Sequence, residues 1–188
     1  MSLKEKILIA DDSEMNQMLL EEILSDKYEY VMAKDGTEAV DILEKNDDID
    51  LVMLDINMPK MDGFGVLEVM NLRHWISEVP VIIISSENYV DFIRRSYDLG
   101  ASDYISRQFD LTVVRRRVEN TLMLYARQKR LVRLVEEQVY EREKTNNTMI
   151  NILSHVIEYR NNESGQHILH VRMMTGTLLH RLIEITDK

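Results

Sequence analysis

The stretch Leu51–Gly63, LVMLDINMPKMDG, decides the fold. It begins with four apolar residues that lead directly into the carboxylate of Asp55. A short run that is apolar at every position is typical of a strand buried on both faces, as in parallel sheets. The Asn, Pro and Gly residues that follow favour a turn. Asp55 is therefore expected at the end of a buried strand, on the sheet edge where open α/β proteins bind ligands.

Two other apolar stretches and one shorter strand also end in polar side chains. They are residues 6–10 followed by Asp11 and Asp12, residues 81–84 followed by Ser85, and residues 103–106 followed by Arg107. Residues 28–33 read as one more strand, and helical patterns separate all five stretches. This alternation predicts an α/β fold with a five-stranded, parallel, doubly wound sheet, whose polar strand ends meet at one edge.

Such an edge would hold three carboxylates, a hydroxyl and a guanidinium. Clustered carboxylates repel one another, so the site favours either protonation or a bound cation. Hard oxygen ligands with open positions suit Mg²⁺. A carboxylate can also attack phosphorus to give an acyl phosphate, and a metal, a hydroxyl and a cation would stabilise the transferring phosphoryl group. Each carboxylate alone could be a solvated strand end or a helix cap; the combination favours phosphoryl chemistry.

At these residues the chain resembles the receiver domain of bacterial two-component response regulators, which is CheY-like and has a flavodoxin-like fold. The matching pieces are Asp11-Asp12, the DINMPKMDG run that begins at Asp55, Ser85, and the segment Gly100–Asp110. The resemblance covers about the first 120 residues and several motifs in order. It implies that Asp55 accepts a phosphoryl group from a histidine kinase or a phosphotransfer protein.

The resemblance also implies roles for the residues around Asp55. The implied Mg²⁺ ligands are Asp11, Asp12, Asp55 and the backbone carbonyl of Asn57, and the implied phosphoryl-binding or switch residues are Ser85, Tyr104 and Arg107. Tyr104 would be the aromatic switch that follows Ser85, although a half-buried strand aromatic is an equal alternative. The implied function is a signalling switch that passes its change of state to an output domain.

One dipeptide departs from the family pattern. Arg107-Gln108 stands where receivers carry Lys-Pro with a cis peptide bond. A cis bond before a residue other than proline costs about 3 kcal/mol, so a trans bond is expected here. Without phosphate, Arg107 is expected either to pair with Asp55 or to turn toward solvent. The departure keeps open a second function, a receiver that serves as a dimerisation or interaction module independently of phosphorylation.

A long helix is expected after the last strand. No Gly or Pro occurs between Gly100 and Gly165, and Val118, Tyr125, Val132 and Val139 recur every seven residues. This heptad pattern predicts a helix over residues 111–158 and a parallel homodimer through it. The alternative is an exposed linker that frays near residues 144–148, which are polar.

The segment Ile157–His167 resembles the start of an HD-GYP domain, a family that hydrolyses cyclic di-GMP with bound metal ions. Glu163 and His167 match metal ligands of that family, and they would share one helical face. Two ligands make a poor metal site, and Fe or Mn would bind only in a complete domain. The resemblance places all other ligands beyond Lys188. We therefore expect the chain to stop inside its output domain and not to be an enzyme itself.

Composition sets the remaining expectations. The 188 residues carry a net charge of −10, and residues 1–110 hold 10 basic and 24 acidic side chains, which disfavours nucleic-acid binding. There are no cysteines, and no apolar run reaches the roughly 20 residues that a membrane span needs. A cytoplasmic protein without a membrane contact is expected. The predicted parts are a receiver at 1–120, a helical coiled-coil linker at 111–158 and an HD-GYP-like helical fragment at 149–188.

Two local expectations concern the first helices. Met15, Met18, Leu19 and Ile23 recur at helical spacing after Asp12, which predicts the first helix. Thr37 is the expected N-cap of the second helix, with the apolar residues Ala39, Val40 and Leu43 facing inward.

Overall fold

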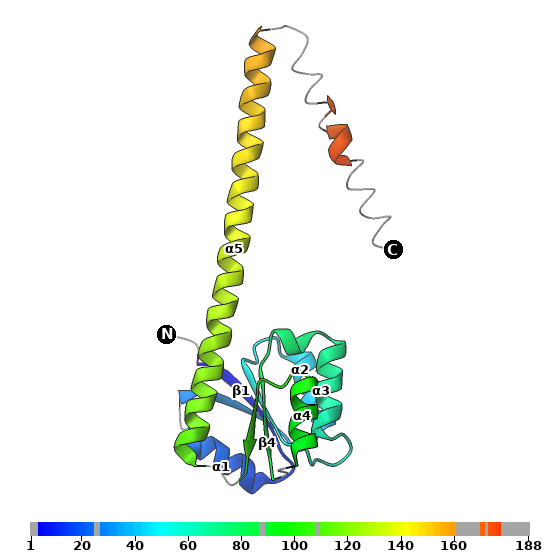
Figure 1. Cartoon of the computed structure of the whole chain (residues 1–188), viewed down its shortest axis with the longest axis vertical. Coiled ribbons are helices and arrows are strands. Elements are labelled where there is room, and N and C mark those ends of the chain that lie inside the picture. The colour runs from blue at the N-terminus through cyan, green and yellow to red at the C-terminus, as the bar shows by residue number, and fades with distance from the viewer. Residues whose placement is uncertain are drawn as a thin grey trace. The chain divides into compact units, whose positions relative to one another are not determined.

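The computed structural model describes residues 4–24, 27–86, 89–107, 110–160, 170–171 and 173–177, with side chains up to residue 156 in the long helix. The chain divides into two units, Met1–Lys129 and Arg130–Lys188. The first unit contains a parallel sheet and the helices that cover it (Figure 1).

Five strands alternate with helices along the first unit. The strands are β1 (Lys6–Ala10), β2 (Glu29–Ala33), β3 (Leu51–Leu54), β4 (Val81–Ser85) and β5 (Asp103–Ser106). The helices are α1 (Glu14–Leu24), α2 (Gly36–Lys45), α3 (Gly63–Leu72), the short 3₁₀ helix η2 (Trp75–Ser77), α4 (Val90–Asp98) and α5 (Leu111–Arg160). All strand pairs are parallel, in the order β2-β1-β3-β4-β5. The predicted doubly wound α/β fold is therefore confirmed.

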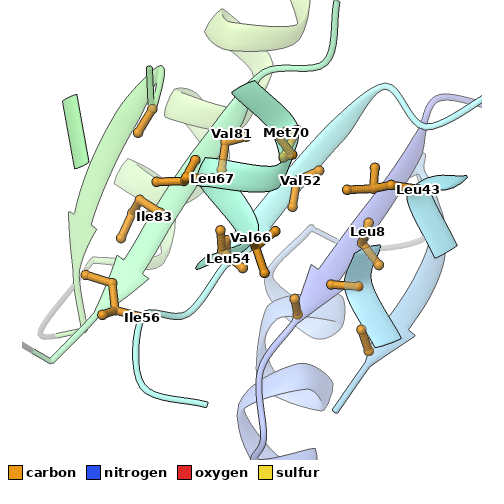
Figure 2. Close-up of a cluster of buried hydrophobic side chains, with 14 of the residues drawn as sticks. Leu8, Leu43, Val52, Leu54, Ile56, Val66, Leu67, Met70, Val81 and Ile83 are labelled. Atoms are coloured by element: carbon orange, nitrogen blue, oxygen red, sulfur yellow. The ribbon is translucent and has the colours of Figure 1, made fainter. Parts of the chain in front are cut away.

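The helices cover both faces of the sheet. On one face, α2, α3 and α4 pack against alternate strand residues such as Leu8, Val52 and Ile83 (Figure 2). Leu67 and Met70 of α3 are fully buried there. Because side chains alternate across a strand, the residues between them face the other side.

On the second face, α1 and the start of α5 pack against the remaining strand residues. Ile9, Met53 and Ile82 are buried beneath them, together with Val114 and Val118 of α5. The central strands β3 and β4 are buried at every position, which explains why their sequences are apolar without alternation.

The strand order places a switch point between β1 and β3. After β1 the chain forms β2 on one side, and after β2 it returns to form β3 on the other side of β1. The connections that leave the carboxyl ends of β1 and β3 therefore diverge, which opens a crevice there. Asp11 and Asp12 follow β1, and Asp55 follows β3, so the fold brings all three to this crevice.

The first helix, predicted from the spacing of Met15, Met18, Leu19 and Ile23, is confirmed as α1. Ile23 is buried with Leu20, whereas Met15 and Met18 are 79% and 70% exposed. The expected cap of the second helix needs correction. The N-cap of α2 is Asp35, whose side chain accepts a hydrogen bond from the backbone N–H of Glu38 at 2.9 Å. Asp35 and Thr37 both carry a side-chain oxygen that can accept such a hydrogen bond, so residue type alone does not decide which of them is the cap.

The helix α5 runs from Leu111 to Arg160, as the absence of Gly and Pro predicted. Its first turns are held to the first unit by Val114, Val118 and Leu122, and the Arg115 side chain donates to the carbonyl oxygen of Ile23 at 2.7 Å and 3.0 Å. Large apolar side chains beyond Lys129 are exposed; they include Leu131, Val132, Leu134, Val135, Val139, Met149, Leu153 and Val156. Among the described residues, no helix combines the length and apolar character that crossing a bilayer requires.

Candidate functional site

Three carboxylates meet at the carboxyl edge of the sheet. Asp11 and Asp55 are 2% and 4% exposed, whereas Asp12 is exposed. One oxygen of each carboxylate lies within 4.8 Å of the others, a spacing that could hold a metal ion. The sequence predicted that these residues would come together, and the parallel sheet is the reason that they do.

Asp11 is held by donors from the start of α1. Its Oδ1 accepts hydrogen bonds from the backbone N–H of Ser13 at 2.9 Å and from Nδ2 of Asn16 at 3.0 Å. The buried amide of Gln17 donates at 2.8 Å to the carbonyl oxygens of both Asp11 and Ala33. Gln17 thus ties the ends of β1 and β2 together. The sequence reading missed both amides, because the spacing of apolar residues on α1 does not show that Gln17 faces inward.

Asp55 is fixed by the backbone around it. Its N–H donates to the carbonyl oxygen of Ala10 at 2.9 Å, which continues the pairing of β1 with β3. Its Oδ1 accepts a hydrogen bond from the N–H of Ile56 at 2.8 Å. The Oδ2 atom points to a different partner, the guanidinium of Arg107.

A single nitrogen of Arg107 bridges the two buried carboxylates. Nη2 lies 2.7 Å from Oδ2 of Asp11 and 2.8 Å from Oδ2 of Asp55. The backbone N–H of Arg107 donates to the carbonyl oxygen of Ser85 at 2.9 Å, which anchors the residue just after β5. Of the two orientations expected from the sequence, the structure has the one that pairs with Asp55, and Asp11 is a second partner that was not foreseen.

Burial raises the pKa of Asp55 to about 6. The Arg107 guanidinium opposes this rise, the Asp11 carboxylate adds to it, and the N–H groups of Ile56 and Asn57 oppose it. Burial prevails because one guanidinium is shared between two carboxylates that have lost most of their water. In the absence of a metal ion, the site therefore disfavours a negative charge on Asp55.

The loop after β3 is pinned from both ends. The N–H of Gly63 donates to the carbonyl oxygen of Ile56 at 2.9 Å. Lys60 has a left-handed backbone with φ of 62°, an uncommon conformation for a residue with a side chain, and its Nζ pairs with Oδ2 of Asp35 at 2.5 Å. That ammonium also holds the pKa of the Asp35 carboxyl below its ordinary value. These contacts fix the backbone that carries Asn57.

The structure describes three of the other expected site residues, namely Asn57, Ser85 and Tyr104. Ser85 is fully buried at the end of β4, and Asn57 is exposed in the loop after β3. Tyr104 is 8% exposed and packs in the core cluster on the α2, α3 and α4 face. Three positions lie outside the described residues, namely Gln108, Glu163 and His167. The expectations for the 107–108 peptide bond and for a second metal site therefore stay predictions.

Comparison with known protein families identifies the first unit. Residues 7–119 match the family described as the response regulator receiver domain. The chain is 36% identical over 123 residues to the sporulation initiation phosphotransferase F of Bacillus subtilis, covering 65% of this chain and 97% of that protein. It is also 29% identical over 189 residues, or 97% of this chain, to a probable cyclic di-GMP phosphodiesterase of Vibrio cholerae. The chain spans 42% of the length of that Vibrio protein.

Solved structures agree with this assignment. A CheY-like receiver domain from Methanospirillum hungatei superimposes with a TM-score of 0.60 at 25% identity, covering 68% of this chain and 99% of that one. A chain from the CheX–CheY–BeF3–Mg²⁺ complex of Borrelia burgdorferi superimposes with a TM-score of 0.57 at 31% identity, covering 63% and 89%. The match over residues 7–119 spans more than half of the sequence. The chain therefore belongs to the response regulator receiver domain family.

Proposed function

We propose that this chain is a response regulator in which Asp55 accepts a phosphoryl group with the help of Mg²⁺. The observation that carries the proposal is the cluster of three carboxylates within 4.8 Å at the carboxyl edge of the sheet. Asp55 is buried at the end of the central strand β3, and its Oδ1 accepts a hydrogen bond from the N–H of Ile56. A carboxylate in that position can act as a nucleophile toward phosphorus.

The residues present fit a magnesium ion. Receiver domains bind Mg²⁺ at an acidic site of this kind. Oxygens that bind one octahedral Mg²⁺ ion are about 3 Å apart when neighbouring and about 4 Å apart when opposite, and the three carboxylates each offer an oxygen within 4.8 Å of the others. We assign the ligands as Asp11, Asp12, Asp55 and the carbonyl of Asn57. When bound, the ion would neutralise the carboxylates and draw charge from the phosphoryl oxygens.

The chain's own residues would supply the nucleophile and bind the phosphoryl oxygens. An oxygen of Asp55 forms the new bond to phosphorus while the bond from phosphorus to the donor nitrogen or oxygen breaks. The hydroxyl of Ser85 and the guanidinium of Arg107 are placed next to this edge and would bind the phosphoryl oxygens. Tyr104, packed in the core beside β4, is the aromatic side chain proposed to respond to a shift of Ser85.

An exposed apolar surface on α1 suits the phosphodonor partner. Met15, Met18 and Leu19 are 79%, 70% and 41% exposed, and they share one face of α1 close to Asp12. We propose that a histidine kinase or a phosphotransfer protein docks there. Met18→Lys should slow transfer from such a protein and leave transfer from a small acyl phosphate unchanged, because only the protein donor needs the docking surface.

The test of the central proposal is direct. The chain is incubated with an acyl phosphate and Mg²⁺, and its intact mass is measured. We expect one added phosphoryl group, none in Asp55→Asn, and normal modification in the control Asp41→Asn, an exposed acid on α2. Chelation of Mg²⁺ should also stop the reaction. Modification that persists in Asp55→Asn would refute the assignment, and an unmodified wild-type chain would favour the interaction module that does not use phosphate.

The proposed output domain follows from the resemblance of residues 157–167 to the start of an HD-GYP domain. Similarity to the probable cyclic di-GMP phosphodiesterase of Vibrio cholerae extends over 97% of this chain, well past the receiver. We propose that the receiver regulates an HD-GYP-like domain in a longer protein. Glu163 and His167 would supply two of its metal ligands. We expect no hydrolysis of cyclic di-GMP by the 188-residue chain, even with Mn²⁺ or Fe²⁺, because two ligands do not form a binuclear site. Turnover that survives His167→Ala would contradict this.

A homodimer is proposed through residues 111–158. The exposed apolar side chains of α5 beyond Lys129 support it, because a helix with this much unburied apolar surface is rarely stable alone. Val132, Val135 and Val139 continue the heptad that begins at Val118. Val118 itself is buried in the receiver core, so the proposed contact between copies begins further along the helix.

A further inference from the structure

We propose that the guanidinium of Arg107 is an internal cation that occupies the Mg²⁺ position of the metal-free site and must leave when the ion binds. This inference rests on the proposed function, since it concerns the same three carboxylates. It adds a property that the family resemblance does not supply, because receivers carry lysine where this chain has Arg107. It predicts that Arg107 sets the affinity of the site for Mg²⁺.

The two oxygens of each buried carboxylate have different partners. Oδ1 of Asp11 already accepts hydrogen bonds from Ser13 and Asn16, and Oδ1 of Asp55 accepts one from Ile56. These donors belong to the backbone or to a packed helix turn and do not need to move. The Oδ2 atom of each carboxylate is therefore the natural ligand for a metal ion.

Arg107 pairs with both of those Oδ2 atoms. Its Nη2 lies 2.7 Å from Oδ2 of Asp11 and 2.8 Å from Oδ2 of Asp55. A Mg²⁺ ion between the same two oxygens would lie about 2.1 Å from each. The ion and the guanidinium nitrogen would then share nearly the same space, and both are cations. Only one of them can occupy the position at a time.

The Arg107 side chain is partly exposed, and we expect it to leave the site while its backbone stays in place. Its backbone is anchored by the hydrogen bond from its N–H to Ser85, whereas its side chain is 26% exposed. The long side chain therefore has a path to solvent that requires rotation about its own bonds only. Once released, the guanidinium stays beside Ser85, where its planar fork suits two phosphoryl oxygens. The same cation would serve the metal-free and the phosphorylated states in turn.

Electrostatics determines the direction of the effect. Asp11, Asp12 and Asp55 together carry up to three negative charges, of which Arg107 compensates one. Removing the guanidinium leaves the two buried oxygens without a cation, so Mg²⁺ no longer has to break an existing pair. A hydrogen bond between charged groups contributes a net amount that corresponds to roughly a tenfold change in affinity or more. We therefore expect Mg²⁺ to bind about tenfold more tightly in Arg107→Gln.

The experiment measures Mg²⁺ binding by calorimetry on the full chain without a phosphodonor. Arg107→Gln should lower the dissociation constant about tenfold, and the control Arg73→Gln should leave it within about twofold. Arg73 suits this purpose because it loses the same charge from an exposed pair with Glu44 at the far end of α3. A dissociation constant that is unchanged or weaker in folded Arg107→Gln would overturn the inference while leaving the metal site in place.

A second measurement does not depend on any variant. The side-chain N–H signals of Arg107 in the wild-type chain are followed by NMR as Mg²⁺ is added. We expect them to shift and to exchange faster with water at the same Mg²⁺ concentrations that saturate the calorimetric titration. Signals that do not change at saturation would overturn the inference alone. Absence of Mg²⁺ binding in every variant would overturn both the inference and the proposed metal site.

Discussion

The Cα of Gly63 lies so close to Asp55 that a Cβ atom added there would be 2.3 Å from the carbonyl oxygen of Asp55. The next nearest atom, Cα of Ile56, would be 2.9 Å away. Both are backbone atoms of the segment that carries the proposed phosphoacceptor, so no side-chain rotation can relieve the contact. The loop after β3 therefore closes against the site only because Gly63 has no side chain.

We predict that Gly63→Ala lowers the free energy of unfolding by about 1–3 kcal/mol, the usual cost of overpacking, and reduces phosphoryl transfer to Asp55. The control is Gly65→Ala, where the added atom would meet the flexible side chain of Met61 at 2.9 Å. That change should be neutral or stabilising, because alanine favours helix α3 over glycine. Urea denaturation measures both variants. Equal effects of the two substitutions would contradict the role given to Gly63.

Gln17 is predicted to matter for stability although it touches no reacting group. Gln17→Met keeps the length of the side chain but removes the donors to the carbonyl oxygens of Asp11 and Ala33. We expect a loss of about 1–3 kcal/mol, because these buried acceptors lose a partner that water cannot easily replace. The control Glu22→Met, at an exposed position of the same helix, should change stability by less than about 0.5 kcal/mol.

Asp55→Asn is predicted to stabilise the metal-free protein at neutral pH. The pKa of Asp55 is raised to about 6, above the value of 3.8 for a free side chain, so the folded state binds a proton more tightly than the unfolded state. The wild-type protein should therefore lose stability as the pH rises from about 4 to about 6 and stay lower above that range. A shift of about 2 units corresponds to an upper limit of about 3 kcal/mol.

Thermal unfolding with a chelator present checks this prediction at several pH values. The melting temperature of Asp55→Asn should exceed that of wild type at pH 7.5, and the difference should shrink toward pH 4.5 as Asp55 becomes protonated. Asp41→Asn, the exposed control, should show no such trend. A gap that grows as the pH falls would mean that the folded-state pKa of Asp55 is lowered instead of raised.

The dimer prediction has a matched pair of variants on α5. Val132 lies on the heptad that begins at Val118, and Leu134 lies two residues further round the helix, away from that line. Both are exposed in the single chain, by 52% and 46%. Val132→Asp should dissociate the dimer, because it buries an unpaired charge between the helices, whereas Leu134→Asp should not. Light scattering measures the molar mass of each variant in solution. A wild-type chain that is monomeric at high micromolar concentration would refute the dimer.

The sequence alone determined the architecture of the receiver and the edge at which its site lies. Buried parallel strands have a local signature, and the runs before Asp11, Asp55 and Ser85 all carry it. Once the strands are parallel, their carboxyl ends must share one edge, so polar residues far apart in the chain are brought together. The long helix was also predicted, because an interruption by Gly or Pro is visible in sequence, whereas the alternative of fraying near residues 144–148 was excluded only by the structure.

Tertiary structure alone decided how the carboxylates are held and what they pair with. The bridge from Arg107 to Asp11 and Asp55 joins three separate strand ends, and the support from Gln17 depends on which face of α1 turns inward. Neither follows from spacing, because a helical repeat fixes a stripe but not the direction of the core. The raised pKa of Asp55 was also decided by the tertiary structure. It depends on lost water and on charges that meet only after the chain has folded.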